Sequence, residues 1–374
     1  MPQTMLDTHI HLWPSTALAP TNHRWMTPGH QLALQHGISE YRAATQLSSP
    51  NQPSGFVYVE TDRFLPSEFP SAMFTGSGEE RRTSMREWAN EPLEELKFLR
   101  RVVEDQPHGG DGFQVGDGDL MKGAVAWAPF QLSSDLFNLY LDLAEETAGP
   151  QLWKRIVGFR YLLQGIRQEA DLRRLVLSED WLQNLLRLRQ GREGKGWAFD
   201  VGVDTHGGGK WQVEVAADMI ETVRNVEGDG SSGHVRFVLN HLCKPDLSNH
   251  ASPHPSLADY AYQYALTRMA AKPLVYMKLS GVFNEFYPSP TPVTSAELNQ
   301  ALQRPLGNIF PLFKNRIMFG SDWPVCNLGG PLGENSWGLW RQVVEDRLQN
   351  AGLSDEEKEQ IWWKAGCEAY RIEM

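Results

Sequence analysis

The sequence predicts an α/β protein, a single (β/α)8 TIM barrel with elaborated βα loops that spans residues 1–374. Short apolar runs rich in β-forming residues recur along the chain, and segments with helical spacing of apolar residues follow them. There are eight such runs, the number that closes a barrel of parallel strands. A hydrophobic share of 41% and a charged share of 22% are typical of a globular protein with a large core.

The predicted strands follow one another at intervals that leave room for a crossover after each. Their ranges are 5–12, 55–60, 123–128, 156–161, 197–203, 235–239, 274–279 and 317–320. The longest interruption, residues 61–120, is interpreted as an elaborated βα loop that carries a helix of its own. Ser354 and Glu357 have the spacing of a capping box, which predicts a terminal helix that runs on towards Arg371.

Composition limits which partners the protein is expected to bind and in which compartment it is expected to work. The chain has 35 Lys and Arg against 46 Asp and Glu, a net charge of −11, which disfavours a nucleic-acid partner. It has no apolar run long enough for a membrane span, so no membrane partner is expected. Its three cysteines form no C-x-x-C pair, and the first strand begins too early for a signal peptide. We therefore expect a cytoplasmic protein.

The first strand carries the most informative stretch, Asp7-Thr8-His9-Ile10-His11. Side chains alternate between the two faces of a strand, which predicts that Asp7, His9 and His11 share one face. Packing alone does not favour two imidazoles side by side, because strands normally bury aliphatic side chains there. The alternative is a pair of surface histidines on an edge strand.

Polar side chains also stand at the ends of the later strands. They are Arg160 after the fourth, His206 after the fifth, His241 after the sixth, Lys278 and Ser280 at the seventh, and Asp322 after the eighth. Barrel enzymes place their sites at the C-terminal ends of the strands, so these residues are expected to meet. This convergence favours an active site over surface histidines at the first strand.

Imidazole nitrogens and one carboxylate oxygen suit a divalent ion such as zinc. The predicted ligands of a single ion are His9, His11, His206 and Asp322. With a metal, a bound water becomes acidic and Asp322 takes its proton. Without one, the histidines donate hydrogen bonds to a carbonyl and Asp322 acts as general base. Both routes end in hydrolysis.

Five further residues are candidates for contact with a substrate. Arg160 and Lys278 stand at strand ends, where substrate contact is favoured over an ion pair inside the barrel. Trp13 and Trp323 either stack on a sugar ring or belong to the core. Glu60 is either a buried structural acid or a carboxylate that supports a metal ligand.

Six short motifs occur in order along the chain, at residues 7–13, 57–60, 157–160, 240–245, 277–281 and 319–324. With them the chain resembles the amidohydrolase superfamily, in particular its amidohydrolase-2 branch of sugar-lactone hydrolases. The resemblance implies a barrel with its active site at the mouth and hydrolysis of a cyclic ester. Any one motif is weak, whereas six in order are specific.

The resemblance also implies residue roles. It matches His9 and His11 to the H-x-H pair, His206 and His241 to the later histidines, and Asp322 to the final aspartate. Asp322, His241 and His206 would then be catalytic. Binuclear relatives have a bridging lysine or glutamate where this chain has Arg160, so one metal ion is expected rather than two. Asn240 stands where the branch usually has an aspartate that supports the sixth-strand histidine.

The predicted activity is hydrolysis of an aldonic acid lactone, first of all a γ-lactone such as L-rhamnono-γ-lactone, to the open-chain acid. A zinc ion is the predicted cofactor, and catalysis without metal stays open. One alternative is a metal-dependent hydrolase or decarboxylase of the same superfamily acting on an aromatic lactone, amide or acid. The other is a catalytically silent barrel that binds a sugar.

Overall fold

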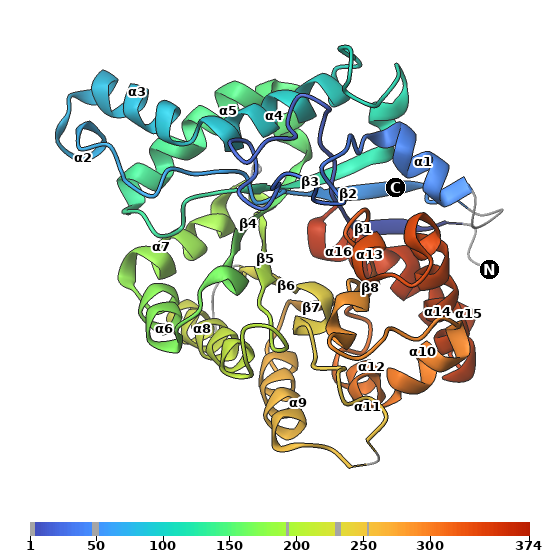
Figure 1. Cartoon of the computed structure of the whole chain (residues 1–374). Coiled ribbons are helices and arrows are strands. Elements are labelled where there is room, and N and C mark those ends of the chain that lie inside the picture. The colour runs from blue at the N-terminus through green and yellow to red at the C-terminus, as the bar shows by residue number, and fades with distance from the viewer. Residues whose placement is uncertain (1–3, 47–51, 192–193, 229–232, 253) are drawn as a thin grey trace.

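Eight parallel strands form one sheet in chain order, from β1 to β8, in the computed structural model (Figure 1). The structure describes residues 4–46, 52–191, 194–228, 233–252 and 254–374. The strands are β1 Leu6–Ile10, β2 Gly55–Val59, β3 Met121–Trp127, β4 Ile156–Leu162, β5 Ala198–Gly202, β6 Arg236–Leu239, β7 Val275–Leu279 and β8 Ile317–Phe319. All eight predicted strands are therefore present, with ends shifted by at most three residues.

Backbone contacts bring the two ends of the sheet together. The His11 N–H donates to the Trp323 carbonyl at 2.8 Å, and the Asp322 N–H donates to the His9 carbonyl at 2.8 Å. Because β1 thus pairs with the segment that follows β8, the sheet is nearly closed on itself. The predicted (β/α)8 barrel is confirmed.

Helices surround the strands (Figure 1). They are α1 Ile38–Gln46, α2 Ala72–Thr75, α3 Gly78–Trp88, α4 Asn90–Val103, α5 Ser134–Arg155, α6 Glu169–Val176, α7 Glu179–Arg187, α8 Trp211–Glu227, α9 Leu257–Ala270, α10 Ser295–Ala301, α11 Gln303–Gly307, α12 Ile309–Leu312, α13 Cys326–Gly329, α14 Ser336–Asn350, α15 Asp355–Glu359 and α16 Ala365–Tyr370. The segment 61–120 carries α2, α3 and α4. No helix in the described part of the chain is long and apolar enough to cross a membrane.

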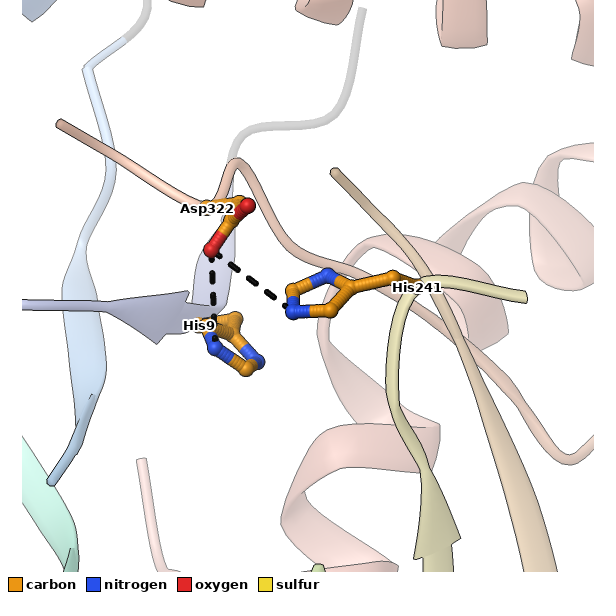
Figure 2. Close-up of side chains that lie close together, drawn as sticks. All are labelled: His9, His241 and Asp322. Carbon is orange, nitrogen blue, oxygen red and sulfur yellow. Dashed lines mark ion pairs between the residues drawn. The ribbon is translucent and has the colours of Figure 1, made fainter. Parts of the chain in front are cut away.

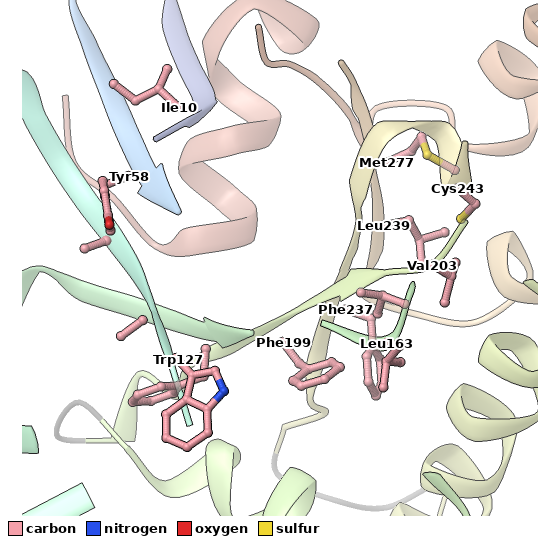
Figure 3. Close-up of a cluster of buried hydrophobic side chains, with 14 of the residues drawn as sticks. Ile10, Tyr58, Trp127, Leu163, Phe199, Val203, Phe237, Leu239, Cys243 and Met277 are labelled. Carbon is pink, nitrogen blue, oxygen red and sulfur yellow. The ribbon is translucent and has the colours of Figure 1, made fainter. Parts of the chain in front are cut away.

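The main core lies between the strands and these helices. Figure 3 shows part of it, where Phe199, Phe237 and Leu239 of neighbouring strands pack with Leu163 and Met277. These side chains are almost completely buried. Burial of so much apolar surface fixes the strands, and through them the position of every strand end.

The C-terminal helix packs against a second apolar cluster. Ala365, Ala369 and Tyr370 of α16 contact side chains from several strands, among them Val57 and Val238. The predicted capping box is present, since the Ser354 hydroxyl accepts from the Glu357 N–H and the Glu357 carboxylate accepts from the Ser354 N–H. The terminal helix is interrupted by a π-helical turn, Gln360–Lys364, before α16 begins.

Candidate active site

Four side chains from three strand ends meet around one carboxylate oxygen, and Figure 2 shows three of them, His9, His241 and Asp322. The Asp322 Oδ1 lies 3.6 Å from His9 Nε2, 3.4 Å from His11 Nε2 and 3.7 Å from His241 Nε2. The two Nε2 atoms of His9 and His11 are 3.2 Å apart. All four side chains are buried. The ends of β1, β6 and β8 therefore assemble a compact cluster of three imidazoles and one carboxylate.

Contrary to the prediction from the sequence, the Asp7 side chain does not join His9 and His11 in the cluster but faces two helices. Its Oδ2 accepts hydrogen bonds from the Tyr41 hydroxyl at 2.9 Å and from the Trp337 indole N–H at 3.0 Å. Tyr41 lies in α1 and Trp337 in α14, so Asp7 ties two surrounding helices to β1. The pairing of β1 with β2 is irregular between Asp7 and Ile10, which breaks the simple alternation that the sequence predicts.

A glycine leaves the space that the cluster needs. Gly281 follows β7 with a φ of +60°, and a Cβ atom there would lie 2.4 Å from His241 Nδ1 and 2.9 Å from Asp322 Oδ2. Neighbouring Ser280 places its hydroxyl 2.9 Å from His241 Nδ1. Only glycine combines this φ with so close an approach of the two catalytic candidates.

Lys278 contacts the buried side of the cluster, at His9, and is not one of the residues that line the cleft. Its Nζ donates to Asp200 Oδ2 at 2.7 Å and lies 3.2 Å from His9 Nδ1. The Tyr370 hydroxyl donates to both oxygens of Asp200. Lys278 and Asp200 are completely buried. The structure thus places Lys278 in a buried network that orients His9.

Hydrogen bonds and burial define the protonation of the cluster. An ammonium group only donates, so His9 Nδ1 accepts from Lys278 and the His9 proton is assigned to Nε2. His11 donates from Nδ1 to the Val59 carbonyl at 2.8 Å, which leaves its Nε2 as an acceptor. Burial lowers the pKa of His241 to about 3 and the pKa of His9 well below its ordinary value. Both imidazoles are therefore neutral at pH 7.

The carboxylate is charged at neutral pH. Burial alone would raise the pKa of Asp322, but the surrounding polar and basic groups, His241, His11 and Lys244 among them, outweigh burial and lower it. An ionised Asp322 beside neutral imidazoles can accept a proton from water. The same arrangement can also ligate a metal ion.

The donor set fits a divalent metal ion. Ligand atoms of His9, His241 and Asp322 lie within 4.8 Å of one another, and His11 Nε2 is next to the same Asp322 oxygen. His11 presents an Nε2 lone pair, and His241 does so when its Nδ1 donates to Ser280. His9 becomes a ligand through Nε2 only when its proton moves to Nδ1, facing Lys278. Nitrogen and oxygen donors of this kind suit zinc.

A cleft of about 300 Å³ opens over the cluster. Its walls include His11, His241 and Asp322 together with Trp13 and Trp25. Its lining includes two acidic residues, Asp62 and Asp322, and two basic residues, Arg160 and Lys244. The strand-end cluster is therefore the floor of an open site large enough for a small molecule.

Both basic residues of the cleft have an acidic side chain beside them. The Arg160 Nε donates to Glu60 Oε1 at 2.5 Å, and its Nη2 donates to the Glu60 carbonyl. Lys244 Nζ lies 3.7 Å from Glu285 Oε1. Burial raises the pKa of Glu285 to about 8. Glu60 thus fixes the Arg160 side chain at the cleft wall, and its partner there is Arg160 rather than a predicted metal ligand.

The structure does not bring His206 and Trp323 to the cleft. The His206 imidazole lies 3.2 Å from Asp246 Oδ1, because the loop after β5 turns it towards the segment that follows β6. Trp323 is buried with its ring beside His36 and Tyr41. Trp13, in contrast, lines the cleft although little of it is exposed. Among the histidines at strand ends, His241 and not His206 completes the cluster.

Sequence reasoning missed Asp62, Lys244 and Trp25 as residues of the cleft. Asp62 follows β2, so the strand-end rule that selected the other residues could have selected it. Lys244 stands in one of the six motifs, four residues after Asn240. Trp25 comes from the long loop after β1, and no spacing in the sequence indicates its position.

Comparisons with known proteins show what this chain is similar to. The amidohydrolase family model matches residues 198–372. A crystal structure of an amidohydrolase from Burkholderia multivorans with bound HEPES superimposes with a TM-score of 0.65 at 19% identity, covering 99% of this chain and 100% of that one. A second structure of that protein, with bound zinc, gives a TM-score of 0.63 at 20% identity and the same coverage. The fold is therefore that of amidohydrolases.

Two relatives named as lactonases extend the similarity. The L-rhamnono-γ-lactonase of Scheffersomyces stipitis is 27% identical over 98% of both chains. The L-fucono-1,5-lactonase of Burkholderia multivorans is 27% identical over 61% of this chain and 70% of that protein. These similarities confirm the resemblance that the six motifs predict.

Proposed function

We propose that this protein hydrolyses a sugar-derived lactone, first of all L-rhamnono-γ-lactone or a close aldonic relative, to the open-chain acid. The observation that carries the proposal is the ionised Asp322 on the floor of an open cleft, with three imidazoles around its Oδ1. The names of the two relatives agree with this activity. A water beside Asp322 is placed to attack a carbonyl carbon held in the cleft.

The charges of the cleft favour an uncharged, hydroxylated substrate. Asp62 and Asp322 balance Arg160 and Lys244, so the lining residues have no excess of cations to hold a carboxylate. Carboxylate and guanidinium groups are also good partners for sugar hydroxyls. The indole rings of Trp13 and Trp25 offer apolar faces to a sugar ring. This balance favours a sugar lactone over an aromatic acid as substrate.

Each step of the hydrolysis can be assigned to a side chain. Asp322 accepts a proton from water as the water oxygen bonds to the lactone carbonyl carbon. The resulting oxyanion is stabilised by the N–H donors of the cleft, among them the guanidinium group of Arg160. The bond from this carbon to the ring oxygen then breaks. The protonated Asp322 returns its proton to the departing oxygen, so that the acid and a free hydroxyl are formed.

Any metal would be held by His11, His241 and Asp322, with His9 as a further ligand. A bound zinc ion supplies a more acidic water and polarises the carbonyl. The chain's own residues keep their roles, since Arg160 orients the substrate and Lys278 fixes His9. The metal we propose is a single ion, because Arg160 stands where a bridging residue would be needed.

The test is turnover of a panel of substrates by the purified protein. Acid release from L-rhamnono-γ-lactone, L-fuconolactones and aromatic lactones is followed in a pH-stat, and carbon dioxide release from aromatic acids is measured in parallel. We expect sugar lactones to be hydrolysed and an Asp322→Asn variant to have a kcat at least about 100-fold lower. Turnover of aromatic acids alone would refute the proposal and favour a decarboxylase. Sugar binding in calorimetry with no turnover of any ester would favour a silent binding barrel.

A further inference from the structure

The segment after β6 folds into a left-handed turn. Four consecutive residues other than glycine, His241, Leu242, Cys243 and Lys244, have φ values of 52°, 55°, 59° and 51°. Left-handed backbone is unfavourable for side chains with a Cβ atom and normally occurs at single residues. A run of four therefore persists only where surrounding groups hold it. It also lies directly beside the site, because His241 and Lys244 both line the cleft.

Groups from two other elements hold the carbonyls of this turn. The Tyr262 hydroxyl, from α9, donates to the Leu242 carbonyl at 2.6 Å. The Thr205 hydroxyl donates to the Cys243 carbonyl at 2.7 Å, and the Thr205 N–H donates to the same oxygen at 3.2 Å. The His206 N–H donates to the Lys244 carbonyl at 3.0 Å. Three successive carbonyls thus receive hydrogen bonds from outside the turn.

These contacts are buried and well suited to fix the backbone. The Thr205 side chain is 7% exposed and the Tyr262 side chain 4% exposed. A buried hydrogen bond to a carbonyl is costly to lose, since water does not readily replace it. Within the turn itself, the Lys244 N–H donates to the His241 carbonyl at 2.7 Å. The position of the His241 imidazole therefore depends on the hydroxyls of Thr205 and Tyr262.

We infer that Thr205 and Tyr262 are positioning residues for His241: they clamp the left-handed turn 241–244 and so hold the His241 imidazole against Asp322. The loop after β5 thereby serves the site through its backbone and Thr205, although the His206 imidazole points elsewhere. Three measurements test this inference, and only the kinetic one rests on the proposed lactone hydrolysis. Amide hydrogen exchange and the His241 ring signal do not depend on it.

The variants Thr205→Val and Tyr262→Phe remove one hydroxyl each. Tyr140→Phe is a matched control, because the buried Tyr140 hydroxyl also donates to a backbone carbonyl, that of Trp127, at 3.2 Å. Thr205→Ser keeps the hydroxyl and is the rescue variant. Amide hydrogen exchange of the peptide 241–247 reports the clamp, and the ¹⁵N signal of the His241 ring in histidine-labelled protein reports the imidazole. Steady-state kinetics with the best lactone report catalysis.

We expect Thr205→Val and Tyr262→Phe to speed exchange at the Lys244 amide at least about tenfold and to shift the His241 ring signal. Their kcat should fall about ten- to a hundredfold with little change in KM, because His241 is displaced and the rest of the cleft is kept. Thr205→Ser and Tyr140→Phe should match the wild type in all three readouts.

Two results would overturn the inference. In the first, Thr205→Val and Tyr262→Phe show the same Lys244 amide exchange rate and the same His241 ring signal as the control Tyr140→Phe. The other is faster exchange with unchanged kcat, since the turn would then be clamped without positioning His241 for catalysis. A wild type that hydrolyses no lactone would defeat the proposed function instead, while exchange and the ring signal still decide the clamp. If Thr205→Val does not fold, Tyr262→Phe carries the same comparison.

Discussion

Replacement of Gly281 by alanine tests whether the close approach of His241 and Asp322 is what the site needs. The added Cβ would lie 2.4 Å from His241 Nδ1, 2.8 Å from His241 Cγ and 2.9 Å from Asp322 Oδ2. Ordinary contacts of such atoms are about 3.5 Å, so the imidazole must move by about 1 Å. A displacement of about 1 Å can cost about 100-fold in rate. We expect Gly281→Ala to lower kcat for lactone hydrolysis by about that factor.

The backbone strain of the substitution needs a separate control. Gly352 has a φ of +65°, close to the +60° of Gly281, but a Cβ there meets nothing within 4 Å. Both alanine variants should lose about 1 kcal/mol of unfolding free energy in urea, because alanine in left-handed backbone is strained. Gly281→Ala should lose about 1–3 kcal/mol more through overpacking. Wild-type kcat in folded Gly281→Ala, or an equal loss of activity in Gly352→Ala, would refute the reasoning.

Four further predictions concern the charges and protons of the site. Asp322→Asn should lower kcat about 10²–10⁴-fold while thermal unfolding stays near that of the wild type, since it removes the general base; residual kcat above a tenth of wild type would contradict this role. Lys278→Met should cost about 3–5 kcal/mol in urea unfolding, because Asp200 is left as a buried charge without its cation; a cost under 1 kcal/mol would argue against the network. Burial lowers the pKa of His23 to about 2 and of His241 to about 3, so between pH 6.5 and 4 the unfolded chain binds more protons than the native one. The unfolding free energy should then fall by about 1.4 kcal/mol per pH unit for each histidine as the pH is lowered, and His23→Gln should reduce the slope by one such share. Dialysis against a chelator should lower lactone turnover and zinc should restore it, with bound zinc counted by elemental analysis; undiminished turnover by metal-free protein would assign catalysis to the side chains alone.

The fold was predictable from sequence because each buried strand is a short apolar run with β-forming residues. The positions of the strand ends also predicted most residues of the cluster, because the C-terminal ends of parallel strands lie at one edge of the sheet. His9, His11, His241 and Asp322 were all selected in this way. This strand-end rule predicts at which edge of the sheet a residue lies, but it does not predict where the side chain points.

The remaining errors come from contacts that are distant in sequence. Lys278 stands at a strand end but points to Asp200, and this choice depends on a buried charge pair that no local pattern reveals. The orientation of His206 depends on how the loop after β5 binds the turn after β6. Trp25 reaches the cleft from a long loop whose path is set by its packing against Trp13 and His23. Loop conformation thus decided what the sequence pattern could not.

Through Tyr370, helix α16 supports the candidate active site. The Tyr370 hydroxyl binds Asp200, which holds Lys278, which in turn holds His9. Residues 9 and 370, far apart in sequence, are thereby linked through three side-chain contacts. A growing chain can form all eight strands before Tyr370 is added, so the buried charge network is completed only after the strands of the barrel. A truncation that removes Tyr370 would therefore disturb His9 without removing a residue of the cleft.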